Sequence, residues 1–414
     1  MKDLFADPNP ILPQQLPRGF RFASTACGLK KSKRSDLALI TSDAEAVAAA
    51  VFTTNRVQAA PVLVSREHLR ASRGTVRAIV ANSGNANCAT GAAGLAASRA
   101  TTVGVARALG CQTHQVLVCS TGVIGVRLDA GKILRAIPRL VTDQARSPEA
   151  YGGAARALMT TDTRPKWSAA GCRIGTKPVR VLGCAKGSGM IHPQMATMLA
   201  FVVTDAAITR SLAQRALAEV AGRTFNSVTV DGDTSTNDTL FLLANGAAGA
   251  PVIGRTGRDY DRFLGALESV CKDLALAIVA DGEGASRVAE IEVRGAPSDT
   301  VAGQVTRTIA GSPLVKTAIA GADPNWGRIL AAAGRAPLAR GVLLETARAE
   351  IRIGGVTVCR RGQAFPFDES VAHQKMKAQY VPIVVDLKSG RGRATVWTCD
   401  FTAEYVRINT AYRT

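Results

Sequence analysis

Aromatic residues are scarce in this 414-residue chain, and histidine is scarcer. Phe, Trp and Tyr together make up 5% of the residues, and there are 4 His. The His are isolated from one another, so their spacing suggests neither a catalytic triad nor a metal site. No charge-free apolar run reaches the roughly 18 residues that a membrane helix needs. We therefore expect no membrane-spanning helix. The first twenty residues hold no continuous apolar segment, so we expect no signal peptide either.

Cysteine is present without a pairing pattern. The chain has 9 Cys, an odd number, with no CxxC and no metal-binding spacing to a His. This usage is typical of a reduced chain whose thiols are buried. We therefore expect a cytoplasmic protein with no disulfide framework and no metal site.

Positive charge exceeds negative charge by a wide margin, with a formal net charge of +19. The charges are spread along the chain, and "KKSKR" at 30–34 is the one tight cluster. No aromatic residues interleave with it, as a single-strand nucleic-acid surface would need, so no nucleic-acid partner is expected. A generally basic surface attracts anions, which favours carboxylate substrates. A non-enzymatic basic binding protein is kept as a rival interpretation.

Hydrophobic residues make up 47% of the chain, enough for a large core. Runs rich in β-branched residues end in Gly, Ser, Thr or Asp, and Ala-rich helical stretches lie between them. This pattern predicts an α/β fold with mixed and antiparallel sheets, and shows no repeat and no domain boundary. We expect strands within 60–66, 75–84, 115–122, 177–187, 195–205, 349–359 and 381–402, the last two as strand pairs, and helices over 92–110, 209–221 and 260–280.

Several known binding and catalytic motifs are excluded because their residues do not have the required spacing. "KGSGM" (186–190) lacks the order of a Walker loop. "DGDTSTND" (231–238) lacks the turn Gly and the final Glu of a calcium loop, which suggests a structural loop that lines a site at most. There is no GxSxG elbow. What remains is a hydroxyl without an obvious base, Thr197, which follows Ala196 in the apolar run after the glycine-rich stretch.

A threonine supplies its own base when it is the first residue of a chain. Its α-amine then has a pKa of about 7.7–8.0 and can accept the hydroxyl proton. Making such a residue here requires cleavage of the Ala196–Thr197 bond, which the flexible loop and the small residue before it would favour. A Thr that merely packs in an apolar strand fits the local pattern as well, so the residues alone leave both interpretations open.

Ten blocks stand out along the chain. They are "GFRFASTACGLKKSKRSDLALI" (19–40), "FTTNRVQAAPV" (52–62), "NSGNANCATG" (82–91), "STGVIG" (120–125), "TTDTRPK" (160–166), "KGSGMIHPQMATMLAF" (186–201), "TVDGDTSTND" (229–238), "VADGEGA" (279–285), "GADPNWGRI" (321–329) and "YVRINTAYRT" (405–414). Together and in this order they resemble the ornithine acetyltransferase family of arginine biosynthesis, also called glutamate N-acetyltransferase. The resemblance covers essentially the whole chain.

The resemblance implies a precursor that cuts itself between Ala196 and Thr197. Residues 1–196 would form an α subunit and residues 197–414 a β subunit, associated as α2β2. The implied fold is a self-cleaving, N-terminal-nucleophile type of α/β architecture, shared with self-cleaving aminopeptidases. It implies no metal and no organic cofactor, and some members also accept acetyl-CoA as a co-substrate.

The resemblance also implies the chemistry. Thr197 would take the acetyl group of N2-acetyl-L-ornithine and pass it to L-glutamate in a ping-pong reaction, with Thr121 and Gly122 stabilising the oxyanion. Lys186 can pair with the α-carboxylate of both substrates, and Glu283 with the ornithine ammonium. The implied substrate-binding positions are Thr160, Lys186, Thr197, Glu283, Asn409 and Thr414.

Each of these residues also has a plain structural interpretation. Lys186 and Glu283 fit solvated surface charges, the Thr121–Gly122 pair fits a turn that closes a strand, and Asn409 and Thr414 fit a frayed tail. A related self-cleaving aminopeptidase or amidase, in which water resolves the same ester, is the rival enzyme. The two charged ends expected of the site favour transfer over hydrolysis.

Overall fold

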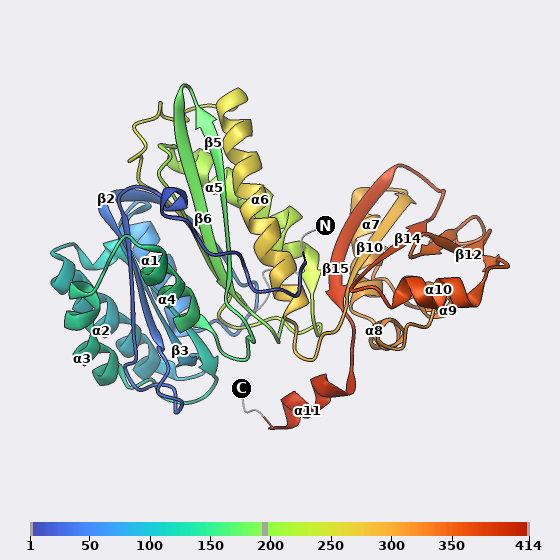
Figure 1. Ribbon diagram of the computed structural model, residues 1–414, viewed down its shortest axis with the longest axis horizontal. Helices are drawn as coiled ribbons and strands as arrows, with labels where there is room; N and C mark the ends of the chain where they lie inside the picture. Colours follow the sequence, from blue (N-terminus) through green and yellow to red (C-terminus); the bar gives the residue numbers. More distant parts are fainter. Residues whose placement is uncertain (1–2, 193–197, 412–414) are drawn as a thin grey trace.

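Two β-sheets organise the chain, which a computed structural model describes over residues 3–192 and 198–411. The sheets lie side by side, with helices packed on each (Figure 1). The first sheet contains β1 (Phe20–Thr25), β2 (Leu37–Phe52), β3 (Thr75–Asn85), β4 (Val116–Val123), β5 (Lys166–Ile174), β6 (Lys177–Lys186), β7 (Leu199–Thr204) and β9 (Thr239–Ala244). In space the strands follow the order β4-β3-β2-β9-β7-β6-β5, and β1 pairs with β2.

The pairing in this sheet is mixed. β3 runs parallel to β4 and β7 parallel to β9, whereas the other neighbours are antiparallel. The predicted α/β fold with mixed sheets is therefore confirmed. The predicted cleavage bond lies between β6 and β7, which are antiparallel neighbours with Lys186 opposite Leu199.

Helices cover both faces of the first sheet, which explains why its central strands are continuous apolar runs. In β7, Ala200 and Val202 pack in the cluster formed with α5 and α6, whereas Phe201 and Val203 pack in the cluster formed with α4. These alternate contacts follow from the two-residue period of a strand. The helices of this part are α1 (Ala60–Ala71), α2 (Gly91–Leu109), α3 (Ala130–Thr142), α4 (Pro148–Leu158), α5 (Arg210–Arg223) and α6 (Arg258–Ala280), with 3-10 turns η1 (Pro13–Gln15), η2 (Thr113–Gln115) and η3 (Phe225–Ser227).

The second sheet has its own core, formed mainly with the helices that follow β10. Its strands are β8 (Val228–Thr229), β10 (Val288–Ala296), β11 (Glu350–Ile353), β12 (Val356–Arg360), β13 (Gln363–Ala364), β14 (Tyr380–Asp386) and β15 (Gly392–Cys399). They follow the order β13-β12-β11-β14-β10-β15-β8. The remaining helices are α7 (Asp299–Ala310), α8 (Pro313–Ala320), α9 (Trp326–Gly334), α10 (Glu369–Met376) and α11 (Ala403–Ala411).

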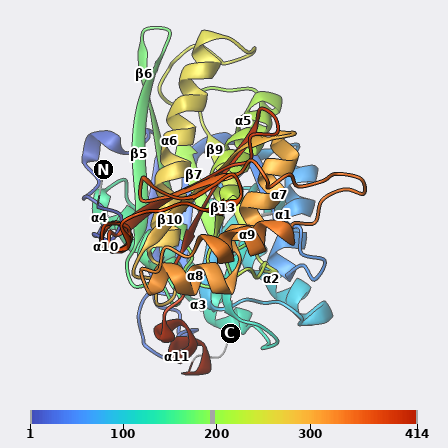
Figure 2. The ribbon, with the colours of Figure 1, turned by 90° about the vertical axis from the view of Figure 1, so that its right-hand side faces the viewer.

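Two long elements of the first part project to one end of the molecule. The β5–β6 hairpin and the first half of α6 rise together there (Figure 2). Their other ends, at Lys186 and Ala280, lead into the loops that carry "KGSGM" and "VADGEGA". The packing of α6 on this hairpin thus brings two distant sequence blocks to the same place.

The strand expected at 60–66 is wrong, because these residues begin helix α1. Short apolar runs do not distinguish a strand from a buried helix. Pro61 stands in the first helical turn, where the missing N–H costs nothing. Val64 and His68, four residues apart, are both buried on one face.

The C-terminal strand pairs were predicted with mixed success. Residues 349–359 form the expected hairpin of β11 and β12, with Gly354 and Gly355 both at positive φ. Residues 381–402 give two strands, β14 and β15, but β10 lies between them. Alternation predicts a strand but does not say which strand it pairs with, and the division into two sheets was likewise not visible in composition.

Candidate active site

One cavity of about 210 Å³ gathers the positions that the resemblance predicted. The two residues predicted to stabilise an oxyanion and four predicted substrate-binding residues line it, although they come from blocks far apart in the sequence. Thr197, its neighbour Ala196 and the C-terminal Thr414 lie outside the described residues. The six lining positions are Thr121, Gly122, Thr160, Lys186, Glu283 and Asn409.

Thr121 and Gly122 lie near the carboxyl end of β4, beside the parallel strand β3. The φ angle of Gly122 is 129°, a value that residues with a Cβ rarely adopt. A Cβ there would lie 2.5 Å from the carbonyl carbon of Gly84 on β3. The close approach of the two strands therefore requires glycine at this end of the sheet, where the cavity opens.

Gly122→Ala is expected to reduce kcat/KM at least about 100-fold, because it would displace the predicted oxyanion donor. It is also expected to lower the free energy of unfolding by about 1–3 kcal/mol through backbone strain. Gly222→Ala is the matched control, since a Cβ there meets open space and its helix tolerates alanine. Steady-state kinetics and thermal unfolding measure both effects, and wild-type kinetics for Gly122→Ala would contradict the assignment.

Lys186 is the last residue of β6 and is buried, with 4% of its surface exposed. Its Nζ lies 4.0 Å from Asp162 Oδ2. Burial lowers the pKa of the Lys186 ammonium, and Asp162 counteracts that shift. Lys186 is thus not a solvated surface charge but a buried cation at the cavity wall.

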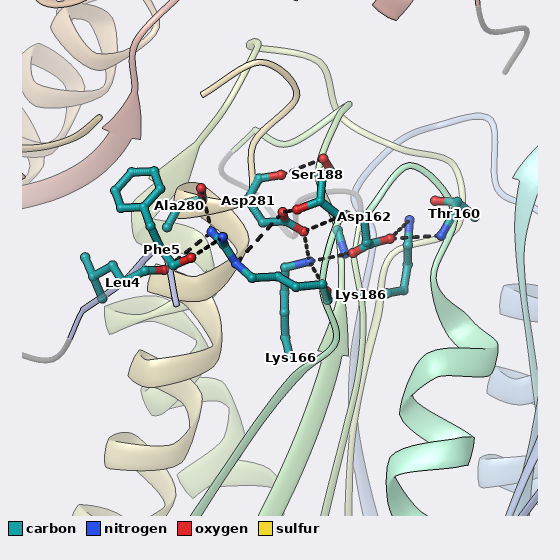
Figure 3. A network of polar contacts seen from close by, with 12 residues as sticks. Leu4, Phe5, Thr160, Asp162, Lys166, Lys186, Ser188, Ala280 and Asp281 are labelled. Carbon is teal, nitrogen blue, oxygen red and sulfur yellow. Dashed lines mark hydrogen bonds and ion pairs between the residues drawn. The ribbon is translucent and has the colours of Figure 1, made fainter. Parts of the chain in front are cut away.

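A buried polar network lies behind this wall (Figure 3). Lys166 Nζ donates to Asp162 Oδ1 at 2.7 Å and to Asp281 Oδ2 at 2.5 Å. Asp162 also accepts the backbone N–H groups of Thr160 and Gly187. The network therefore joins the three loops that carry Thr160, Lys186 and Glu283. The sequence did not predict this network, although Asp162 and Lys166 stand four residues apart in "TTDTRPK" and Asp281 is the first residue of "DGEG".

Glu283 follows this network and is 6% exposed. Its Oε2 accepts a hydrogen bond of 2.8 Å from Asn409 Nδ2 on α11, and its N–H donates to the carbonyl of Ser188. A Cβ on Gly189 would lie 2.5 Å from the Glu283 carboxyl carbon. The second glycine of "KGSGM" thus makes room for this carboxylate, and Asn409 belongs to a helix that contacts the site rather than to a frayed tail.

The loop 231–238 lines the same cavity. Asp231 accepts the backbone N–H groups of Met190 and Ile191, and burial raises the pKa of its carboxyl to about 6. Asn237 donates to the carbonyls of Ala86 and Ser120, and these hydrogen bonds hold the loop against β4, which carries Ser120. The expectation of a structural loop that lines the site is therefore supported.

Asp238 closes that loop and lies against the beginning of β7. Its Oδ1 accepts the Met198 N–H at 2.9 Å, and Met198 directly follows Thr197. Its Oδ2 is buried and has no hydrogen-bond partner among the residues that the structure describes. Burial raises the pKa of Asp238 well above its usual range. Nothing in the sequence singled out this residue, because the contact joins positions 40 apart.

The described parts of the chain hold no group of three or more His, Cys, Asp and Glu side chains arranged to bind a metal ion. In these same parts, no helix has both the length and the apolar character to cross a membrane. The described part of the cavity wall offers one buried cation, several carboxylates and the strand end at Gly122.

The chain is similar to a known protein family and to named relatives over almost all of its length. A family model, the ArgJ family, matches residues 21–414. The arginine biosynthesis bifunctional protein ArgJ of a Synechococcus species is 46% identical over 407 residues, 96% of each chain. The protein of that name from Brucella melitensis is 46% identical over 420 residues, 99% of each chain.

Two solved structures are also similar. One is the arginine biosynthesis bifunctional protein from Bacillus halodurans, with 43% identity and a TM-score of 0.49, covering 51% of this chain and 98% of that one. The other is the ornithine acetyltransferase from Mycobacterium tuberculosis complexed with ornithine, with 36% identity and a TM-score of 0.39, covering 46% of this chain and 98% of that one. The family match and the full-length relatives confirm the resemblance seen in the sequence, and the chain belongs to the ArgJ family.

Proposed function

We propose that the protein is an arginine-biosynthesis acyltransferase that moves the acetyl group of N2-acetyl-L-ornithine to L-glutamate. One observation carries the proposal: a single cavity brings a buried cation, Lys186, and a buried anion, Glu283, to the strand end at Gly122. An amino-acid carboxylate fits the first charge and the ornithine ammonium fits the second. Relatives named as arginine biosynthesis bifunctional proteins support the same activity.

In the proposed reaction, Thr197 Oγ attacks the acetyl carbonyl while its α-amine takes the hydroxyl proton. Thr121 and Gly122 stabilise the negative oxygen. The C–N bond then breaks, the proton passes to the departing amine, and ornithine leaves an acetyl ester on Thr197. The α-amine of glutamate attacks this ester, the Thr197 oxygen regains its proton, and N-acetyl-L-glutamate leaves.

We also propose that the chain cuts itself between Ala196 and Thr197 into the pieces 1–196 and 197–414, which stay associated. The pairing of β6 with β7 supports this association, because one piece would end just after β6 and the other would begin just before β7. Asp238 supports a fixed geometry, since it binds the N–H of the residue after Thr197. Assembly as α2β2 belongs to the same proposal.

The proposal calls for no metal and no organic cofactor, and it includes acetyl-CoA as a second acetyl donor.

We place the enzyme in the cytoplasm on the evidence of its cysteines. The nine are free thiols, most of them buried. A chain with this many unpaired thiols suits a reducing compartment.

The test is an assay with N2-acetylornithine labelled in its acetyl group. With glutamate present, label is expected in N-acetylglutamate and ornithine is released in equal amount. Without glutamate, turnover is expected to stop after one acetyl group per site. Rapid release of labelled acetate without glutamate would instead identify the rival aminopeptidase-like hydrolase, and no turnover with either acceptor would overturn the proposal.

Ornithine is expected to bind about fivefold more tightly at pH 7 than at pH 5. Asp231 lines the cavity and burial raises its pKa to about 6, so it is neutral at pH 5 and charged at pH 7. A charge gained a few ångströms from a cation changes the binding free energy by about 1 kcal/mol in a solvated pocket. Calorimetric titration at several pH values measures the trend. Asp231→Asn should flatten it, and an unchanged slope in that variant would refute the assignment.

A further inference from the structure

The one tight basic cluster of the sequence lies in the loop between β1 and β2, here called the basic loop (residues 26–35). Asp36, at the end of this loop, is fully buried and accepts the backbone N–H groups of Cys27, Leu29 and Lys30 at 2.6–2.9 Å. Ser83 on β3 also donates its N–H to the Asp36 carbonyl. The basic loop therefore has a fixed attachment to the end of β3.

The basic loop lies directly behind the strand end of the active site. A Cβ on Gly84 would meet Lys30 Cγ at 3.1 Å and the Leu29 carbonyl at 3.3 Å, and a Cβ on Gly122 would meet Gly84 itself. Two glycines thus leave only backbone between the basic loop and the predicted oxyanion position. Lys30 Nζ donates to the carbonyl of Ala157, at the end of the helix that leads to Thr160.

One of the four cations of the basic loop forms hydrogen bonds within the fold, and the other three are exposed. Lys30 is half-buried and bonds to carbonyl groups. Lys31, Lys33 and Arg34 are exposed and form no ion pair within the parts of the chain that the structure describes. Each lies within about 14 Å of Lys30 along the chain, because a residue spans at most ~3.6 Å. Three free cations thus stand beside the site but outside its small cavity.

The amino-acid substrates do not need these cations. Their α-carboxylate is expected inside the cavity at buried Lys186. The side-chain carboxylate of glutamate is only a few bonds from that group, so it stays within the cavity as well. A donor that carries its acetyl group at one end of a long arm and several phosphates at the other does need them. Clustered Lys and Arg side chains are the usual partners of phosphate groups.

We infer that the basic loop, through Lys31, Lys33 and Arg34, binds the phosphorylated tail of a thioester acetyl donor, for which acetyl-CoA is the probe. The inference rests on the proposed acetyl transfer. Thr197 Oγ attacks the thioester carbonyl, the C–S bond breaks, and the thiolate takes the proton that the Thr197 α-amine accepted. The same acetyl ester forms, and glutamate resolves it as before.

The test compares two variants of the complete enzyme with equal changes in charge. Lys31→Gln/Lys33→Gln/Arg34→Gln removes the cations of the basic loop. The control is Lys177→Gln/Arg255→Gln/Arg258→Gln. It removes three exposed cations at or near the first residues of β6 and α6, whereas the last residues of these elements lead to the cavity. Glutamate is saturating, and the donors are acetyl-CoA, acetyl-pantetheine, which lacks every phosphate, and N2-acetylornithine.

In the basic-loop variant, the KM for acetyl-CoA is expected to rise about tenfold to hundredfold, since three exposed charge contacts are lost and each contributes modestly. The kinetics with acetyl-pantetheine and N2-acetylornithine should change less than twofold, and the control variant should match the wild type with all donors. In the wild type, added salt should raise the KM for acetyl-CoA, and the basic-loop variant should respond less.

Two results would overturn the inference. One is a wild-type enzyme that transfers acetyl from N2-acetylornithine but not from acetyl-CoA. The other is a basic-loop variant in which the KM values of all three donors rise together, which would mean that the basic loop acts on every donor and not on the phosphates. Failure of transfer from N2-acetylornithine in the wild type is a different result, because it rejects the proposed function itself.

Discussion

Thr197→Ala is expected to stay one chain of 43.2 kDa and to transfer no acetyl group. The wild type should separate on a denaturing gel into pieces of about 20 and 23 kDa, in proportion to their residues in the 43.2 kDa chain, the larger beginning with "TMLAF". Both effects have one cause, because the same hydroxyl would attack the Ala196 carbonyl in the precursor and the acetyl carbonyl in the mature enzyme. Gel electrophoresis, N-terminal sequencing and the labelled-acetyl assay measure them.

Thr197→Ser is the control for this result. It keeps the hydroxyl, so it should still be cut and retain part of the activity, whereas loss through misfolding would affect both variants alike. Circular dichroism of Thr197→Ala should match that of the wild type. A wild-type chain that is uncut and yet fully active would reject the mechanism. Cleavage of the Thr197→Ala chain would mean that another residue is the nucleophile for cleavage.

The residues that line the cavity were predictable from the sequence where a whole block supplies them. Lys186, Glu283 and Asn409 were assigned by block, and the structure places all three on one cavity. The elements around them followed from local pattern, since β6 is a run of mostly apolar residues and α6 keeps a helical period over its length. The helix at 60–71 was missed, because a short apolar run carries no period of its own.

What could not be read from the sequence is the set of contacts between distant residues. Asp238 meets Met198 across 40 positions, and Lys166 meets Asp281 across 115. A buried charge looks like any surface charge until its partners are known, since Lys and Asp are common on surfaces. The interpretation of Lys186 as a solvated cation failed for this reason.

Lys166→Met, made in the uncut Thr197→Ala chain, is expected to lower the free energy of unfolding by about 3–5 kcal/mol. Removing one partner of a buried ion pair leaves buried charge poorly compensated. Asp162 would keep only Lys186 as a cationic partner, and Asp281 only Arg164, each at 4.0 Å. Urea titration measures the loss. Lys177→Met is the control, because this exposed lysine lies on the same hairpin and its loss should cost less than about 0.5 kcal/mol.

The pH dependence distinguishes this ionic role from simple packing. Burial disfavours the charged Asp162, but Lys166 and Lys186 outweigh it and hold the pKa of that carboxyl well below its usual range. A carboxyl with a depressed pKa stabilises the fold at neutral pH, and this stability is lost as the pH falls below about 4. The uncut parent should therefore lose stability in that range, and Lys166→Met should lose much less. Equal acid sensitivity in both chains would show that Lys166 acts through its packing alone. The ion pairs of Lys166 would then not be what holds Thr160, Lys186 and Glu283 in place.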